Sequence, residues 1–318
     1  MFITNEEKIR DLAGIVKTLT VKPDFIEMLV PKINAGEDKR ILAYLVIVTI
    51  CHQTQGAEGI SRDGRKITGN PFLIDRISNW AETSEEILPG NFNNVDSKGL
   101  AEILSNSDAE HCVFREITRR LELLRATYKY FEKHSVEDLK ELGRIPINEI
   151  YAHIKREFGT AFSTDPMMKK ASYFIMLMHL SGIWKDIDMD GFIPMVDYHK
   201  QRLMLRTGMV RCTDEEAKRK LKNKEALGDD LELRKACSDA FRFLGKYSGK
   251  GMMELSHIDW IIGRNCCRVE PACTAECSYE KCNLGDFLDY QCHGRCPLET
   301  KCDKLTAFFE PNVDTDFY

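Results

Sequence analysis

The chain has 318 residues, of which 43% are hydrophobic and 30% charged, so it can bury the core of one large domain or of two coupled ones. Its formal net charge of −5 gives no support to a nucleic-acid partner, because phosphate binding normally requires a basic surface. The first residues lack the pattern of a secretory signal, and the longest apolar run, 41–51, is far shorter than the roughly 20 residues of a membrane span. We therefore expect a globular, cytoplasmic protein.

Apolar residues recur at helical spacing along most of the chain, whereas alternating strand patterns are scarce. We therefore predict an all-α fold. The predicted helices cover 6–17, 38–51, 111–132, 146–158, 167–180, 197–207 and 229–247, and one more ends near Arg264. Gly and Asn cluster in 56–70 and 88–99, and Asp and Pro cluster in 183–195, so these three segments are predicted to be loops.

Two groups of basic residues are candidates for a local phosphate-binding patch. One lies in the predicted helix 111–132 and comprises Arg115, Arg119, Arg120 and Arg125. The other is the segment 218–224. Runs of this kind are more often solvated helix faces, so they carry little weight.

Eight of the 12 cysteines fall between Cys266 and Cys302. In a cytoplasmic chain such crowding indicates metal ligands before disulfides. The segment is also rich in Pro and Gly and has little periodicity, as expected where a metal rather than an apolar core holds the chain together. We divide the chain into a helical domain at 1–265, a metal-binding module at 266–302 and a C-terminal tail at 303–318.

Asp197 stands where a segment that resists helix formation, 192–196, meets a run of good helix formers. At such a helix N-terminus its carboxylate can accept backbone N–H bonds, and the helix dipole favours its ionised form. A plain N-cap role explains the same position.

The loop before Asp197 also has the spacing of a calcium-binding EF-hand loop. The residues that fit are Asp186, Asp188, Asp190 and Gly191, with Asp197 at the twelfth position. Against calcium, the twelfth residue is Asp rather than the usual Glu, and no second loop is visible to pair with it.

The stretch Val196-Asp197-Tyr198-His199, followed by Arg202, resembles the Val-Asp-x-His-x-x-Arg stretch of endonuclease III-type DNA glycosylases. The overlapping stretch 193–198 is similar to that of the archaeal 8-oxoguanine glycosylases, which belong to the same helix-hairpin-helix superfamily. The resemblance implies that Asp197 is the catalytic carboxylate, which stabilises positive charge on the sugar as the N-glycosidic bond breaks. It also implies that His199 lies at the substrate.

The segment 165–174 is similar to the helix that carries the Schiff-base lysine in bifunctional members of that superfamily. Lys169 stands at the matching offset, so the resemblance implies that it is the nucleophile, with Lys170 as the alternative or as a substrate-binding residue. A lysine attacks only as the free amine, which burial or a neighbouring cation favours. Two solvated lysines beside an apolar stripe would give the same sequence. The Leu-Pro-Gly-x-Gly hairpin of the common subfamily does not precede Lys169.

The stretch 260–267 resembles the lead-in to the iron–sulfur loop of endonuclease III-type enzymes, and Cys267 best matches the first ligand. The resemblance implies a [4Fe–4S] cluster; zinc is the alternative, with His293 as a further ligand. Two trios of cysteines nearly match the other three ligands: Cys292, Cys296 and Cys302, or Cys273, Cys277 and Cys282. The spacing does not choose between the trios, and eight cysteines could hold two sites.

Residues 50–55 are similar to the segment from which family members insert a polar side chain into the gap left by a flipped base. We assign Gln53 to this role. A helix that ends in polar residues explains the segment equally well.

These resemblances follow the family's order from about residue 40 to 302. Together they predict a two-lobed helix-hairpin-helix glycosylase that acts as a monomer on duplex DNA and removes a modified base, with an oxidised purine favoured. Lys169 would form an imine with the sugar and could nick the strand as an AP lyase. Two other classes stay open: a nucleoside or nucleotide N-glycosidase of the queuosine-salvage type, and a non-catalytic metal-binding interaction protein.

Overall fold

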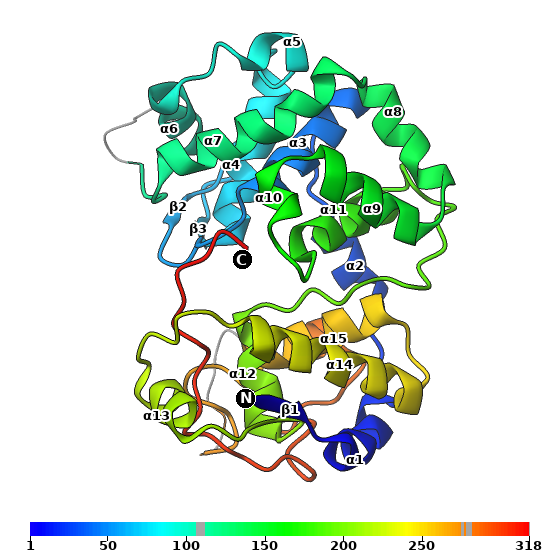
Figure 1. The fold of residues 1–318 in the computed structure, drawn as a ribbon, viewed down its shortest axis with the longest axis vertical. Helices are drawn as coiled ribbons and strands as arrows, with labels where there is room; N and C mark the ends of the chain where they lie inside the picture. Colours follow the sequence, from blue (N-terminus) through cyan, green and yellow to red (C-terminus); the bar gives the residue numbers. More distant parts are fainter. Residues whose placement is uncertain (106–111, 275–276, 278–281, 318) are drawn as a thin grey trace. The chain divides into compact units, whose positions relative to one another are not determined.

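The computed structural model describes residues 1–105, 112–274, 277 and 282–317. This part of the chain is mostly helical and contains four strands of three residues each (Figure 1). The helical class expected from the apolar periodicity is therefore confirmed, whereas the helix-hairpin-helix arrangement stays a prediction.

The chain forms two compact units. The first unit comprises Met1–Glu27 and Met189–Asp314, and the second comprises Met28–Asp188 and Thr315–Tyr318. The cysteine-rich segment 266–302, which we predicted as a separate module, belongs to the same compact unit as the Asp197 helix.

The first unit is built on a small antiparallel sheet and a layer of helices. Its elements are β1 (Phe2–Thr4), α1 (Glu6–Val16), the start of α2 (Pro23–Leu29), α12 (Tyr198–Thr207), β4 (Val210–Cys212), α13 (Glu215–Asn223), α14 (Leu231–Ser248), α15 (Met252–Asn265) and α16 (Leu284–Phe287). β1 pairs with β4, with Phe2 opposite Cys212. α14 packs against α1 and β1, and α12 packs against α14 and α15.

The longest helix, α14, shows why these segments are helical. Its fully buried residues recur at intervals of three and four: Leu233, Cys237, Ala240, Phe241 and Leu244. They form one apolar stripe that faces the core of the unit. The helix ends at Gly249, which has a left-handed backbone with φ of 75°, a conformation that glycine adopts without steric cost.

The second unit surrounds one buried helix. Its elements are α3 (Glu37–Thr49), β2 (Glu58–Ile60), β3 (Lys66–Thr68), α4 (Asn70–Thr83), α5 (Pro89–Phe92), α6 (Ser97–Ser105), α7 (Ile117–Tyr128), η2 (Lys129–Glu132), α8 (Val136–Glu141), η3 (Leu142–Arg144), α9 (Ile147–Glu157), α10 (Thr160–Ser163) and α11 (Lys169–Leu180). α3 packs against α4, α7, α8 and α11, and every residue from 41 to 50 is buried. The longest apolar run of the sequence is thus the central helix of a helical unit. Among the described residues, no helix is both long and apolar enough to cross a membrane.

Two of the predicted loops contain regular structure. The segment 56–70 holds the β2–β3 hairpin, with Glu58 opposite Thr68. The segment 88–99 holds α5 and the beginning of α6. β2, β3 and α5 are only three or four residues long, and α6 begins at the edge of its segment. Such short stretches of helix or strand show too little periodicity to be recognised in the sequence. The segment 183–195 contains no helix or strand, as predicted.

Candidate functional site

Asp197 is the N-cap of α12, as its position in the sequence predicted. Its backbone is extended, and its Oδ1 accepts a hydrogen bond of 3.0 Å from the backbone N–H of Lys200. The residue is half-buried. A fixed carboxylate of this kind can stabilise positive charge near it, but it also serves simply as a helix cap.

His199 lies beside Asp197 in the first turn of α12 and is half-buried. Its Nδ1 is 3.1 Å from Nη2 of Arg202. Burial lowers the pKa of His199 to about 4; the carboxylate of Asp197 acts in the opposite direction, and Arg202 lowers the pKa further. The imidazole is therefore neutral near pH 7, so it can exchange hydrogen bonds with a polar ligand but supplies no positive charge for phosphate.

Two buried arginines of α12 hold the cysteine-rich segment to this helix. Arg202 donates from Nε to the Cys267 carbonyl at 2.6 Å and pairs with Glu310 at 2.7 Å. Arg206 donates to three backbone carbonyls, those of Arg268, Val269 and Phe308. Because both side chains are at most 2% exposed, these bonds are shielded from water and fix the position of the segment.

Several cysteines of this segment influence one another's pKa. Cys296 contributes most to raising the pKa of Cys266, burial raises it as well, and Cys282 and Cys292 act in the same direction. Cys266 in turn lowers the pKa of Cys296. A metal–thiolate site needs several thiolates near one another. These four cysteines are therefore the first candidates to test for such a site.

Cys267, which best matched the first ligand in the sequence, has a different environment. Burial raises its pKa to about 11, while Arg206 and Arg202 act in the opposite direction. Cys267 and Cys273 act electrostatically on Cys302, and Cys277 acts on Cys282. Among the described residues, no three of these sulfurs lie within 4.8 Å of one another. Both the iron–sulfur cluster and zinc stay predictions.

In the second unit, Lys169 and Lys170 begin α11. The ammonium group of Lys170 is fully buried and donates a hydrogen bond of 2.6 Å to the Thr49 carbonyl at the end of α3. Burial lowers the pKa of Lys170 to about 8. Lys169 is half-buried; its Nζ lies 3.7 Å from Sγ of Cys51 and 5.9 Å from the ring centre of Tyr173. The two lysines that the sequence could not separate thus differ clearly in exposure.

Gln53, the candidate for base insertion, follows the same end of α3 and belongs to the same unit as the lysines. Its Nε2 donates to the Thr315 carbonyl at 3.3 Å. The structure therefore brings Gln53, Lys169 and Lys170 onto neighbouring helix ends. Asp197 and His199 belong to the first unit.

Several residues of the second unit have a positive φ. Five described residues other than glycine have positive φ, and three of these belong to this unit: Gln53, Glu116 and Met168. Met168 immediately precedes Lys169, and Glu116 caps α7. The first unit holds the other two, Lys224 and Lys304, so positive φ does not distinguish the second unit.

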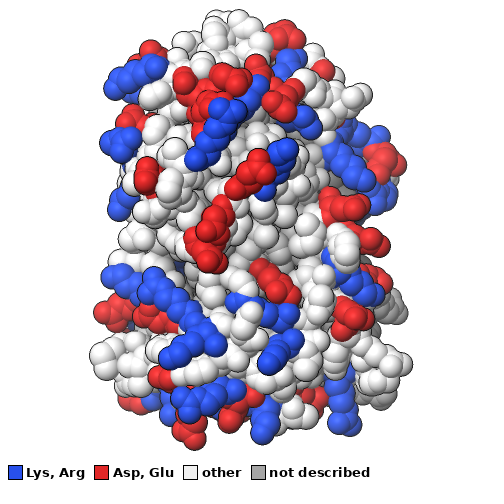
Figure 2. Space-filling view, turned by 90° about the vertical axis from the view of Figure 1, so that its right-hand side faces the viewer, with Lys and Arg blue, Asp and Glu red and all other residues white. Residues whose placement is uncertain are grey.

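The arginine group of α7 is not a free phosphate patch. Arg120 is fully buried and donates to the backbone carbonyls of Ile50 and His52. Arg119 donates from Nε and Nη2 to Oδ2 of Asp316, at 2.9 and 2.7 Å. On the face drawn in Figure 2, basic and acidic side chains are interspersed. Arg119 and Arg120 are therefore already engaged within the protein.

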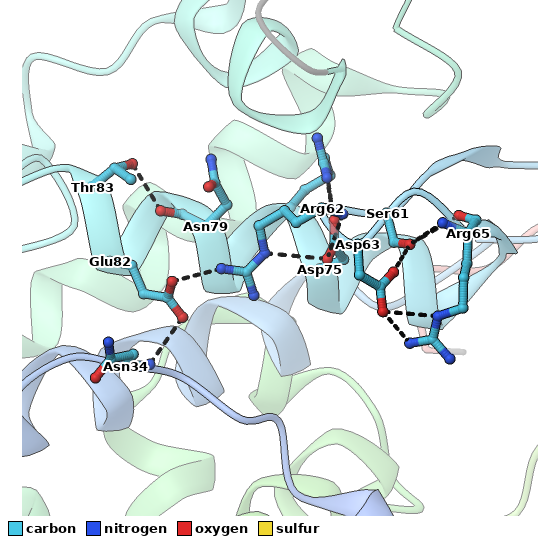
Figure 3. Close-up of polar contacts among 10 residues, drawn as sticks. Asn34, Ser61, Arg62, Asp63, Arg65, Asp75, Asn79, Glu82 and Thr83 are labelled. Atoms are coloured by element: carbon cyan, nitrogen blue, oxygen red, sulfur yellow. Dashed lines mark hydrogen bonds and ion pairs between the residues drawn. The ribbon is translucent and has the colours of Figure 1, made fainter.

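A surface hollow of about 530 Å³ lies beside α4 and the β2–β3 hairpin. Figure 3 shows its polar lining, in which Arg62 contacts Asp75 at 3.3 Å and Glu82 at 2.6 Å. Arg65 pairs with Asp63 at 2.6 Å. Because these charges are compensated, the hollow offers less attraction to an anion than its arginines suggest.

One group of three described His, Cys, Asp or Glu side chains places its ligand atoms within 4.8 Å of one another: His52, Glu116 and Asp316. Sequence reasoning missed this group. In the sequence, the only indication of this group was that His52 stands next to Gln53. The aspartates of the calcium-like loop, Asp186, Asp188 and Asp190, do not form such a group.

No protein-family model matches the sequence, and no curated protein matches it significantly.

Proposed function

We propose that this protein is a DNA glycosylase that removes a modified base, an oxidised purine in the first instance, with Lys169 as its nucleophile. The observation that carries the proposal is the set of polar residues on neighbouring helix ends in the second unit. There Lys169 is half-buried, with its amine 3.7 Å from Cys51, and Gln53 follows at the end of the same helix as Cys51.

The difference between the two lysines favours Lys169. Lys170 is fully buried and its ammonium group is bonded to the Thr49 carbonyl, so a substrate could reach it only if that bond and the surrounding packing were broken. Lys169 is partly exposed. In this proposal Lys170 positions the start of α11, and Lys169 performs the chemistry.

The proposed reaction uses the free amine of Lys169. Its nitrogen lone pair attacks C1′ of the deoxyribose, the C1′–N bond breaks, and the electron pair of that bond leaves with the base, which takes up a proton. Proton loss from nitrogen and opening of the sugar ring give an imine. Water then hydrolyses the imine and restores the amine, or loss of a 2′ proton expels the 3′ phosphate by β-elimination.

Asp197 has the electrostatic role in this proposal. Its N-cap position fixes the carboxylate, and an anion fixed in advance stabilises positive charge on the sugar without reorganising. The neutral imidazole of His199 would contact the substrate by hydrogen bonding. Both roles come from the family resemblance and are supported by the cap geometry.

The cysteine-rich segment has a structural role in the proposal. A [4Fe–4S] cluster would be held by four of its cysteines and would stabilise the loop through its iron–thiolate bonds. Cys266 and Cys296 are the first pair to test, because each changes the pKa of the other. The bonds from Arg202 and Arg206 connect this loop to the helix that carries Asp197.

The test is release of base from a panel of modified oligonucleotides, duplex and single-stranded, compared with free nucleosides of the same bases. Release from oligonucleotides alone is the expected result. Hydrolysis of nucleosides alone would replace the proposal with a nucleoside N-glycosidase, a class favoured by the net charge of −5. No release from any substrate, by protein whose folding and metal content have been verified, would contradict both enzymatic functions.

A further inference from the structure

Three side chains that take no part in the proposed chemistry converge in the second unit. His52 follows α3, Glu116 caps α7, and Asp316 lies in the C-terminal segment. One nitrogen or oxygen atom from each side chain lies within 4.8 Å of the other two. The chain thus assembles one imidazole and two carboxylates from three distant parts of its sequence.

His52 is the most unusual member of this group. It is fully buried, and neither ring nitrogen has a hydrogen-bond partner among the described residues. A buried polar group without a partner destabilises the fold, so a ligand that engages the ring would stabilise it. Burial, and then the surrounding lysines and arginines, lower the pKa of His52 to about 2. The ring is therefore neutral and keeps the lone pair that a metal ion requires.

The distance from His52 to Asp316 also fits a shared ion. Nε2 lies 3.6 Å from Oδ1 of Asp316, which is long for a hydrogen bond. Two ligands that each lie about 2.1 Å from a tetrahedral metal are about 3.4 Å apart. Because Arg119 binds Oδ2 of Asp316, its bonds leave Oδ1 for the ion.

Glu116 supplies the third ligand. Its side chain is exposed, and its carboxylate forms no hydrogen bond or ion pair with the described residues. Its backbone has a φ of 55°, a strained conformation for glutamate. A bound ion would offset part of that strain by engaging the carboxylate.

We propose that His52, Glu116 and Asp316 bind one divalent transition-metal ion of the class that accepts mixed nitrogen and oxygen ligands. Three protein ligands leave at least one coordination position for water. The ion would also hold the C-terminal segment on the second unit. This site is separate from the cysteine-rich segment and does not depend on the proposed function.

The neighbouring cations repel a metal ion and therefore weaken its binding. Removal of one of them gives a second test, in which the affinity for the metal should increase. Arg119 contacts Asp316 directly, and Lys169, Lys170 and Arg120 act electrostatically on His52. Lys170 and Arg120 are buried and bonded to backbone carbonyls, and Lys169 belongs to the proposed chemistry, so Arg119 is the cation to neutralise. We expect Arg119→Gln to tighten metal binding about threefold or more, because one repelling charge is removed.

Binding of Mn²⁺ to the full-length protein tests the site, because thiolates are poor ligands for this ion and the cysteines would not compete. Electron paramagnetic resonance of free Mn²⁺ during a titration gives the stoichiometry and affinity. We expect one ion per chain, and at least tenfold weaker binding in Glu116→Gln and in Asp316→Asn. Glu149→Gln, which removes an exposed charge from α9 of the same unit, is the matched control and should bind as the wild type does.

Both carboxylate variants change side chains that are at least partly exposed, so neither should prevent folding. The proposal is overturned if the wild-type protein binds no Mn²⁺. It is equally overturned if Glu116→Gln and Asp316→Asn bind the ion as tightly as the wild type.

Discussion

Replacement of Asp197 separates its capping role from its proposed catalytic role. Asparagine keeps an oxygen that can accept the N–H of Lys200, so Asp197→Asn should change the free energy of unfolding by no more than a few tenths of a kcal/mol. Alanine removes the acceptor and should cost about 1 kcal/mol. For a chain of 318 residues that cost lowers Tm by about 1–2 °C.

The two variants should behave alike in catalysis. Both remove the negative charge, and the loss of one preorganised electrostatic group typically lowers kcat by about 10²–10³-fold. The assay combines thermal unfolding with single-turnover release of base from the best oligonucleotide. We expect Asp197→Asn to be stable and nearly inactive, and Asp197→Ala to be both less stable and nearly inactive.

The reasoning fails if Asp197→Asn retains the wild-type rate, because the carboxylate charge would then be unnecessary. It also fails if Asp197→Asn is as unstable as Asp197→Ala, because the cap would then depend on more than the observed hydrogen bond.

Three further predictions concern stability. Asp259 is fully buried without a hydrogen-bond partner among the described residues, and burial raises its pKa. The contribution of Asp259 to the free energy of unfolding is therefore most favourable below about pH 4, and it is lost as the pH rises toward the raised pKa. The stability advantage of Asp259→Asn in urea unfolding should grow between about pH 5 and pH 8, and a constant difference would contradict this. Arg206→Met leaves three buried carbonyls without donors and should cost about 3 kcal/mol in the same assay, whereas Arg211→Met, at an exposed position, should cost almost nothing. Gly159 has φ of 73°, and a Cβ there would lie 2.7 Å from the Ala126 carbonyl oxygen, so Gly159→Ala should cost about 2 kcal/mol; an unchanged Tm would show that α7 moves away easily.

The sequence predicted helices best where one apolar stripe runs along the whole segment. The predicted helix 146–158 is α9 (Ile147–Glu157), and the predicted helix 197–207 is α12 (Tyr198–Thr207). Local signals were enough for these helices, including a capping residue at Asp197. The β2–β3 hairpin was missed because strands of three residues carry too little alternation to distinguish them from a loop.

The sequence was less informative about polar groups whose partners are distant along the chain. Arg120 was expected on a solvated helix face, but it is buried because carbonyls at the end of α3 accept its hydrogen bonds. The mutual effect of Cys266 and Cys296 on their pKa values was not predicted either, since the family resemblance favoured Cys267 as the first ligand. The grouping of His52 with Asp316 depends on where the C-terminal segment lies, which no local pattern encodes.

Borohydride trapping of the proposed imine tests the central claim most directly. The full-length protein is incubated with borohydride and a duplex that contains the modified base it removes. Covalent adducts are then quantified by gel electrophoresis. We expect an adduct with the wild-type protein and with Lys170→Met, which keeps the volume of that buried side chain, and none with Lys169→Gln. An adduct that persists in Lys169→Gln, or base release without any adduct in the wild-type protein, would contradict the assignment of Lys169 as the nucleophile.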